Sequence, residues 1–387
     1  MQGAFDCKAD QFNCTEWCVP EEWLCDQYLD CGGDEDEAGC VTWLVGLNGF
    51  CYETNTHRSY KLPSPLPIPI KQNYDVLLVG YLRGGTTFAG KILGLRQGNF
   101  YIYEPFHNLS TWGYFKPGYH CSMNDERCNK YNGTDRLVLD VLRGIYHCDK
   151  MYLLHSLQMW QVLKGRGYDD DLKNPMWMEY FPECHGEVEG CVEKCVSQCS
   201  NSIARVSKVP RLSVSLAAQL LHSEPNLKII HLLRDPRAIM NSRHSLKWAT
   251  APGVSLSLCK KMKEDYLNSD IIRKVFPGKV LTVFYEDLVT NPLETVRTMY
   301  DFAGYDFDEK ESFRLNKITG MTTNDAQMSS GKRTSLQIAT AWRTKINLST
   351  VDVINQGCND LYSLVGYPPL RNEIDLRNSS IPLRLSN

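Results

Sequence analysis

The sequence predicts an α/β fold, a parallel sheet with helices on both sides, for most of the chain, and a separate small module for its first 41 residues. Two strand–turn–helix junctions, at residues 76–90 and 227–243, predict the sheet. Six cysteines within residues 1–40 predict the module, because so short a segment cannot bury enough apolar surface to fold without cross-links. The 387-residue chain has room for both the module and a domain with a sizeable core.

The first junction is an apolar run, residues 76–79, that breaks into glycines and then into a helical pattern. Gly80 and Gly85 have the separation of a phosphate-binding loop, and bare N–H groups at a helix start favour an anion. A nucleoside triphosphatase loop would place Lys directly after the second glycine. Thr86 stands there instead, and the cation, Arg83, comes before the glycine pair, which disfavours a P-loop kinase.

The second junction is the apolar run 229–233 followed by Arg234. Asp235 is a good N-cap, and Pro236 suits the first position of a helix. We therefore expect Arg234 at the carboxyl end of a strand, where α/β folds bind their ligands. Ser242 lies two turns into the helix on a face of small residues, which lets a phosphate or a ribose come close.

These segments resemble those of sulfotransferases, above all the Golgi carbohydrate 6-O-sulfotransferases. Residues 83–88 (RGGTTF) are similar to the family's 5′-phosphosulfate loop, and residues 227–243 are similar to its 3′-phosphate element. The resemblance continues in order through residues 101–109, 207–212, 283–292 and 341–367. Phe284 departs from it, because the family carries Arg before Tyr-Glu-Asp-Leu. Six ordered matches are more specific than any one of them.

The resemblance implies a PAPS-dependent carbohydrate sulfotransferase, an enzyme that takes a sulfuryl group from 3′-phosphoadenosine 5′-phosphosulfate. It implies that PAPS is bound by Arg83, Gly84, Gly85, Thr86, Thr87, Phe88, Arg234 and Ser242. The implied acceptor is the 6-hydroxyl of GlcNAc, Gal or GalNAc in a glycan, glycoprotein or proteoglycan. No nucleic-acid partner is expected.

The chemistry of sulfuryl transfer assigns the catalytic roles. Negative charge grows on the leaving phosphate, which Arg83 and the N–H groups of residues 84–88 would stabilise. The acceptor hydroxyl needs a base, for which Glu104 is the candidate and His107 the alternative. Lys208 would contact the sulfuryl oxygens, or be a solvated surface lysine. No divalent metal is implied at this site.

Residues 1–40 resemble an LDL-receptor class A module. Six cysteines leave fifteen connectivities open, and the resemblance implies Cys7–Cys18, Cys14–Cys31 and Cys25–Cys40. It also implies one Ca²⁺ ion, held by the carboxylates of Asp26, Asp30, Asp36 and Glu37 and by the backbone carbonyls of Trp23 and Tyr28. The alternative is an acidic solvated loop. Such a module would bind a protein partner or orient the enzyme.

Composition divides the rest of the chain into a Pro-rich connector (42–72), a sulfotransferase-like domain (73–370) and a weakly ordered tail (371–387). The Cys-rich stretch from about residue 110 to 205 predicts disulfide-tied loops and short helices. Cys191, Cys195 and Cys199 lack the paired spacing of a zinc ribbon, so disulfides are favoured for them. Trp342 and Arg343 would close over a ligand, or be a buried Trp beside a surface Arg.

The net charge of −3 hides a division of charge. Residues 1–40 contain eleven acidic residues and one Lys, for −10, which leaves +7 for the rest and suits an anionic co-substrate. Five glycosylation sequons, at Asn13, Asn108, Asn132, Asn347 and Asn378, agree with a secretory route. No run approaches the ~20 apolar residues of a membrane helix, and no signal peptide is present. We expect a Golgi lumenal protein whose type II membrane anchor precedes this sequence, or a secreted one.

A second class of function remains open from the sequence. The chain would then be a Ca²⁺-dependent extracellular binding protein with an inactive sulfotransferase-like scaffold. The intact Arg83, Glu104, Arg234 and Ser242 argue against it.

Overall fold

The computed structural model describes residues 11–13, 18–20, 73–94, 96–107, 109–110, 112–123, 127–130, 133–153, 188–246, 253–319 and 334–385. Before residue 73 it gives two short strands, β1 (Gln11–Asn13) and β2 (Cys18–Pro20), which pair antiparallel. The six predicted calcium ligands, the three predicted disulfides of residues 1–40 and the Pro-rich connector lie outside the described residues.

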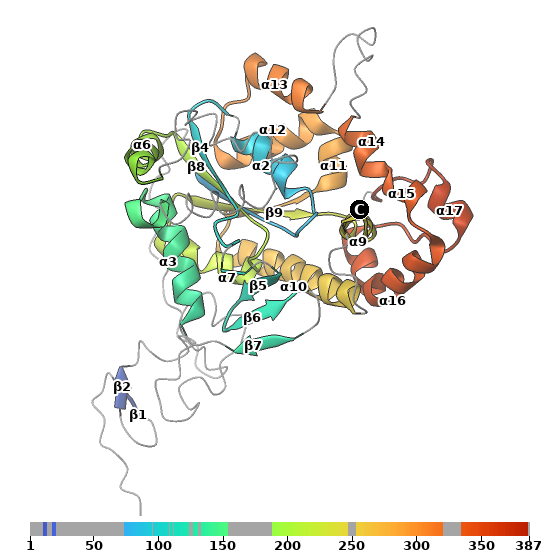
Figure 1. The fold of residues 1–387 in the computed structure, drawn as a ribbon, viewed down its shortest axis with the longest axis horizontal. Coiled ribbons are helices and arrows are strands. Elements are labelled where there is room, and N and C mark those ends of the chain that lie inside the picture. The colour runs from blue at the N-terminus through green and yellow to red at the C-terminus, as the bar shows by residue number, and fades with distance from the viewer. Residues whose placement is uncertain are drawn as a thin grey trace, which may run out of the picture.

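A five-stranded parallel sheet forms the centre of the described domain, as the sequence predicted (Figure 1). Its order is β10-β9-β3-β8-β4, and every neighbouring pair is parallel. The strands are β3 (Asp75–Val79), β4 (Asn99–Tyr103), β8 (Ala204–Val209), β9 (Leu227–Leu233) and β10 (Val280–Phe284). Because all five run the same way, the turns that follow them open at one edge of the sheet.

Helices cover both faces of this sheet, which confirms the α/β class. Alternate residues of β3 point to opposite faces, so Leu77 and Val79 join one apolar cluster while Val76 and Leu78 join the other. The first cluster contains α3 (Thr134–Tyr146), α6 (Val188–Ser200), α7 (Val214–Ala218) and α8 (Leu220–Ser223). The second contains α2 (Thr86–Gly94), α11 (Tyr285–Thr290), α12 (Pro292–Ala303), α13 (Glu309–Thr319) and α14 (Ser335–Thr340). A parallel sheet buried on both faces needs continuous apolar strands, which made residues 76–79 recognisable.

A third group of helices packs together beyond the end of β9, and most of it lies at the right of Figure 1. It consists of α9 (Pro236–Ser245), α10 (Val254–Val275), α15 (Trp342–Lys345), α16 (Leu348–Val365) and α17 (Glu373–Arg377). A disulfide between Cys259 and Cys358 joins α10 to α16. This group therefore supports the part of the sheet edge where Arg234 follows β9.

The Cys-rich stretch contains regular structure that the sequence analysis missed. Three strands form an antiparallel sheet, β5 (Gly113–Lys116), β6 (Tyr119–Ser122) and β7 (Cys128–Lys130), and Cys121–Cys128 cross-links two of them. All of β7 is exposed and β6 buries only Cys121, so neither strand has an apolar run to reveal it. The prediction of short helices is also wrong for α3, which has 13 residues.

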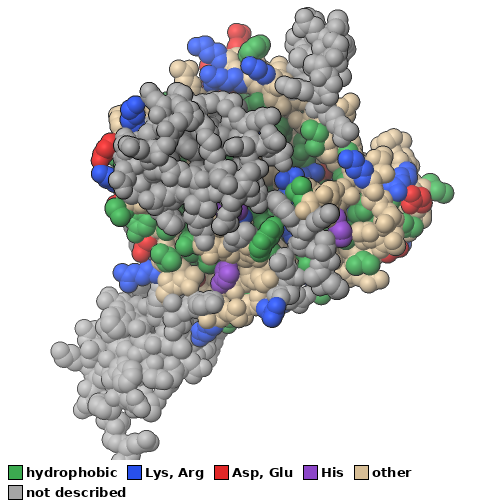
Figure 2. Space-filling view, in the orientation of Figure 1, with side chains coloured by type: hydrophobic (Ala, Val, Ile, Leu, Met, Phe, Trp, Pro, Cys, Tyr) green, Lys and Arg blue, Asp and Glu red, His purple; other side chains and the backbone are tan. Residues whose placement is uncertain are grey.

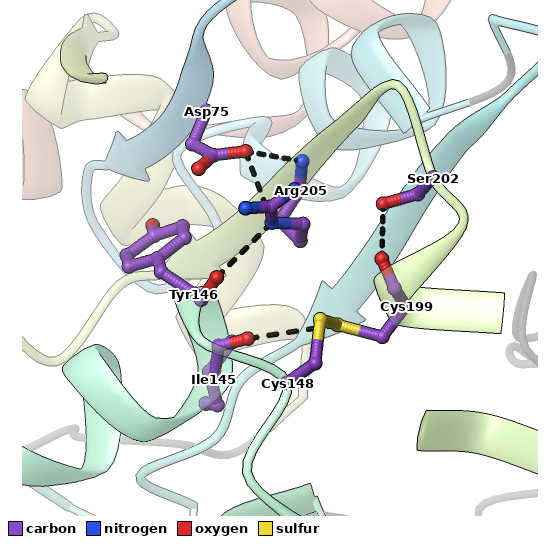
Figure 3. The surroundings of a disulfide bond; sticks show 7 residues. All are labelled: Asp75, Ile145, Tyr146, Cys148, Cys199, Ser202 and Arg205. Atoms are coloured by element: carbon purple, nitrogen blue, oxygen red, sulfur yellow. Dashed lines mark hydrogen bonds and ion pairs between the residues drawn. A yellow bond between two sulfur atoms is a disulfide. The ribbon is translucent and has the colours of Figure 1, made fainter. Parts of the chain in front are cut away.

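The Cys148–Cys199 disulfide connects the end of α3 to the end of α6 (Figure 3). Close to it, Arg205 donates to the Tyr146 carbonyl at 3.1 Å, and its backbone N–H donates to Asp75 Oδ1 at 2.6 Å. The disulfide therefore holds two helices beside the starts of β3 and β8. The disulfide expected for Cys195 is wrong, because this residue is a free, buried thiol. Burial raises the pKa of this thiol to about 12.

The tail also differs from the expectation of weak order. Residues 371–385 pack on the domain, with a short helix, α17, and a fully buried Leu376. Arg343 is buried rather than on the surface, and it donates to the carbonyls of Asn378, Ile381 and Pro382 at 3.3, 2.7 and 3.0 Å. Sequence patterns miss such order because it depends on contacts between distant segments.

Candidate functional site: two anion turns and a buried carboxylate

The first turn (residues 80–85) leads from β3 into α2. Gly85 has a φ of 86°, and a Cβ at this position would lie 2.3 Å from the Tyr285 ring, so only glycine fits. Arg83 has a φ of 69°, which non-glycine residues rarely adopt, and its side chain is exposed. Strained backbone of this kind is concentrated at functional sites. The Gly84 N–H, expected among the anion donors, instead donates to the Tyr81 carbonyl at 2.8 Å.

The second turn (residues 234–235) leads from β9 into α9. Asp235 caps the helix as predicted, since its side chain accepts from the Arg237 N–H at 2.8 Å, and Pro236 takes the first helical position. The Asp235 N–H donates to Glu286 Oε1 at 2.9 Å. The capped helix and the buried Glu286 fix the backbone that carries Arg234.

The structure brings Arg83, Arg234 and Ser242 together. Arg234 Nη1 donates to the Arg83 carbonyl at 2.9 Å, and Arg83 Nε donates to Ser242 Oγ at 2.9 Å. The Arg234 guanidinium also lies over the Tyr285 ring, 4.4 Å from its centroid. Arg234 Nε is buried and has no partner among the described residues. A buried cation donor without an acceptor is what an anion-binding site leaves for its ligand.

Glu104 follows β4 directly and lies at the centre of a charged cluster. Its carboxylate accepts from Lys208 Nζ, on β8, and from Arg211 Nη1. All three are buried, with exposed fractions of 7%, 1% and 3%. Burial alone would raise the pKa of Glu104, but the charges of Lys208 and Arg211 outweigh it and hold that pKa well below its usual value. Glu104 has a φ of 45°, so it shares the left-handed backbone of Arg83.

Lys208 connects this carboxylate cluster to the first helix of the site. Its Nζ lies 3.3 Å from Thr87 Oγ1, in the first turn of α2, and 3.8 Å from the centroid of the Tyr103 ring. The parallel pairing of β4 with β8 places Tyr103 opposite Lys208 and so sets this arrangement. Lys208 is thus a buried residue that contacts the start of α2, rather than a solvated surface lysine.

His107 lies beside the cluster, with Nδ1 3.7 Å from Glu104 Oε2. Arg211 Nη2 lies 2.8 Å from the same Nδ1, and an arginine can only donate. A neutral His107 therefore accepts at Nδ1 and carries its hydrogen on Nε2. Since its only lone pair is engaged, this geometry favours Glu104 over His107 as the base.

Some predicted residues lie elsewhere or are not described. Trp342 is buried under the Arg237 guanidinium, and Arg343 binds the tail, so neither closes over the turns. Thr86 is buried at the start of α2, and Phe88 packs edge-on against Tyr285. Within the described residues, no group of three or more His, Cys, Asp or Glu is placed to hold a metal ion. The predicted calcium ligands lie outside them.

Sequence reasoning missed Arg211 and Tyr285 as site residues. Arg211 stood three residues after Lys208 in a recognised segment, but its contact with Glu104 depends on the pairing of β4 with β8. Tyr285 stood in the Tyr-Glu-Asp-Leu segment, and it contacts both Gly85 and Arg234. Their positions within motif-like segments were the available signal.

A parallel sheet with two arginine-bearing turns at one edge defines an α/β protein of the kind that binds ligands at the carboxyl ends of its strands. The chain belongs to the sulfotransferase family, since the family model described as "Sulfotransferase domain" matches residues 73–365. This confirms the family predicted from the ordered motifs. The likeness of residues 1–40 to an LDL-receptor class A module stays a prediction.

Individual relatives are more distant. The chain is 27% identical to carbohydrate sulfotransferase 1 of Danio rerio, over 80% of this chain and 81% of the relative. It is 26% identical to carbohydrate sulfotransferase 3 of Mus musculus, over 80% and 71%. Among solved structures, the sulfotransferase domain of the Synechococcus PCC 7002 olefin synthase matches at 18% identity and a TM-score of 0.37, over 77% of this chain and 98% of that one. A mouse sulfotransferase complexed with PAP matches at 12% and 0.36, over 80% and 88%.

In the part of the chain that the structure describes, no helix is both long and apolar enough to span a bilayer.

Proposed function

We propose that this protein is a PAPS-dependent carbohydrate sulfotransferase, which transfers a sulfuryl group to a 6-hydroxyl of GlcNAc, Gal or GalNAc in a glycan. The observation that carries the proposal is the direct contact between the two turns, in which Arg234 binds the backbone of Arg83 and Arg83 binds Ser242. The names of the relatives support a sugar acceptor, since those matched over most of the chain are carbohydrate sulfotransferases.

The donors of the site fit PAPS, which has a phosphate at each end of its ribose. Arg234 and Ser242 would hold the 3′-phosphate, where Arg234 Nε is the buried donor without an acceptor. Arg83 and the N–H groups at the start of α2 would hold the 5′-phosphosulfate. Gly85 lets the backbone come close there, because Tyr285 occupies the space of a side chain. PAPS supplies the activated sulfuryl group.

The chain's own residues then account for the transfer. The acceptor oxygen forms a bond to sulfur while the bond from sulfur to the bridging oxygen breaks, and the phosphate leaves with that electron pair. Arg83 stabilises the charge that develops on the phosphate. The proton of the acceptor hydroxyl passes to the Glu104 carboxylate.

Glu104 has a low pKa, which keeps it ionised but makes it a weak base. A movement of Lys208 would make Glu104 a stronger base. Lys208 Nζ already lies close to Thr87, at the 5′ end of the site. If Lys208 turns towards the sulfuryl oxygens, Glu104 loses one of its two cationic partners and its proton affinity rises. Base strength would then increase when the co-substrate is in place.

Transfer of radiolabelled sulfate from PAPS to a panel of glycans tests this function. We expect label on at least one 6-hydroxyl acceptor, and Glu104→Gln should lower kcat by about 10²–10⁴-fold while nucleotide binding is kept. The matched control is Glu309→Gln, an exposed carboxylate on α13, which should transfer normally. If the wild-type protein binds neither PAP nor PAPS and labels no acceptor, it is a binding protein with an inactive scaffold instead.

The same proposal places the protein in the Golgi lumen, or outside the cell, where PAPS-dependent modification of glycoproteins takes place. The N-terminal segment would be a Ca²⁺-binding accessory module that contacts a protein partner or the acceptor. The Cys121–Cys128, Cys148–Cys199 and Cys259–Cys358 disulfides support an oxidising compartment.

A further inference from the structure

Arg243 lies next to Ser242 on α9 and points away from solvent, with an exposed fraction of 4%. Its Nε and Nη2 both donate to one acceptor, the carbonyl of Leu82, at 3.2 and 3.1 Å. Among the described residues it forms no ion pair. Burial lowers its pKa to about 10, and the charge of Arg83 acts in the same direction, so Arg243 stays cationic at neutral pH.

This contact completes a set of three between the segment 234–243 and the first turn. Arg234 binds the Arg83 carbonyl, Ser242 accepts from the Arg83 side chain, and Arg243 binds the Leu82 carbonyl. Two consecutive residues of the first turn are thus held at three points. Arg83 needs such support, because its backbone has a φ of 69°.

The arrangement also links the two ends of the nucleotide site mechanically. Ser242 and Arg243 are neighbours on one helix, so a phosphate that draws Ser242 towards it moves Arg243 as well. Arg243 would carry this movement to Leu82 and so to Arg83. A bound anion would further stabilise a region where Arg83, Arg234 and Arg243 lie together.

We propose that Arg243 is a positioning residue that couples recognition of the 3′-phosphate to the shape of the 5′-phosphosulfate cradle. The inference rests on the proposed function, because it assumes that the two turns hold the two ends of one nucleotide. It goes beyond that function by making the geometry at the reacting end depend on the 3′-phosphate.

Nucleotide binding to the full chain, measured by calorimetry, tests the coupling. The ligands are adenosine 3′,5′-bisphosphate, adenosine 5′-monophosphate, adenosine 3′-monophosphate and adenosine. The four affinities give the factor by which one phosphate strengthens binding of the other. We expect Arg243→Gln to reduce this factor by about ten-fold, while the affinity for adenosine 3′-monophosphate changes little.

Arg243→Lys keeps the charge but loses the two-pronged contact, so it should keep only part of the coupling. Arg143→Gln is the control, since Arg143 lies on α3 and binds Ser223 and Asp140 rather than either turn. The coupling factor of this variant should equal that of the wild type. In turnover, Arg243→Lys should lower kcat more than it raises KM for PAPS, as expected when the reacting end is misplaced.

Two outcomes are separable. If the wild-type protein binds the bisphosphate but both Arg243 variants keep the full coupling factor, or lose affinity for all four ligands equally, Arg243 is only structural and the inference is wrong. If the wild-type protein binds none of the nucleotides, the proposed function itself fails.

Discussion

At the residue scale, the site depends on a few side chains that fix the backbone of others. Tyr285 fills the space beside Gly85, and the Arg234 guanidinium lies over its ring. Arg83 and Arg234 could be predicted because each follows an apolar run and precedes a helix signal, which are local patterns. Arg211 could not, because only the paired strands bring it to Glu104.

Gly85→Ala tests the close contact in the first turn. The added methyl group would meet the Tyr285 ring at 2.3 Å and would also strain a residue whose φ is 86°. We expect a loss of about 1–3 kcal/mol in nucleotide binding, since the cradle must move. Gly118→Ala is the control, because its φ of 70° brings the same strain but a Cβ there meets nothing within 4 Å. Equal PAP affinities for the two variants, measured by calorimetry, would contradict the tight contact.

Glu286 predicts a pH dependence of stability. Burial, and then the charge of Asp235, raise its pKa to about 7 from the usual 4.5. The folded state thus keeps a proton that the unfolded chain releases, so this group's stabilisation is complete below pH 4.5 and is lost as the pH rises through 7. Glu286→Gln mimics the protonated form. The difference in unfolding free energy, wild type minus variant, should therefore fall between pH 5 and 7.5, by at most about 1.4 kcal/mol per pH unit.

Thermal midpoints across this pH range supply the measurement, with the exposed Glu309→Gln as the control. A difference between wild type and Glu286→Gln that stays constant with pH would show that Glu286 is ionised in the folded protein.

At the element scale, the long parallel strands were predictable and the short antiparallel ones were not. β3 and β9 are buried on both faces and therefore appear as apolar runs with glycine or an N-cap after them. β6 and β7 are four and three residues long, and only Cys121 is buried among them, so they have no such pattern. The Cys148–Cys199 and Cys259–Cys358 pairings were equally hidden, since they join residues 51 and 99 positions apart in sequence.

The disulfides should differ in their contribution to stability. They join cysteines that are 7, 51 and 99 residues apart, for Cys121–Cys128, Cys148–Cys199 and Cys259–Cys358. If loss of chain entropy in the unfolded state dominates, removing each pair would cost roughly 2, 4 and 5 kcal/mol. We expect the drop in thermal midpoint to be smallest for the Cys121–Cys128 double-Ala variant and largest for the Cys259–Cys358 one. A larger loss for the Cys121–Cys128 variant than for the other two would mean that local packing decides instead.

At the scale of the whole molecule, charge separates the predicted module from the enzyme. Residues 1–40 carry a net charge of −10 and the remaining residues +7. The basic part suits an anionic co-substrate, and Figure 2 shows Lys and Arg side chains over several described parts of one face. The acidic part suits a hard cation such as Ca²⁺.

Removal of Ca²⁺ tests this separation in the full chain. With EGTA present, we expect faster proteolysis within residues 1–40 and an unchanged rate of sulfate transfer, because the six proposed ligands all precede residue 41. Excess Mg²⁺ with EGTA serves as the control for ionic strength. Activity that falls together with chelation would show that the two sites depend on each other, and unchanged proteolysis would remove the metal site.

The contact between Arg343 and residues 378–382 has a consequence for variants of the gene. Its guanidinium uses carbonyls of Asn378, Ile381 and Pro382 as acceptors, so a product that stops after Arg377 would bury a cation without them. A frameshift or an alternative final exon that replaces these residues would then act mainly by lowering the stability of the folded domain. Such alleles would show little folded protein.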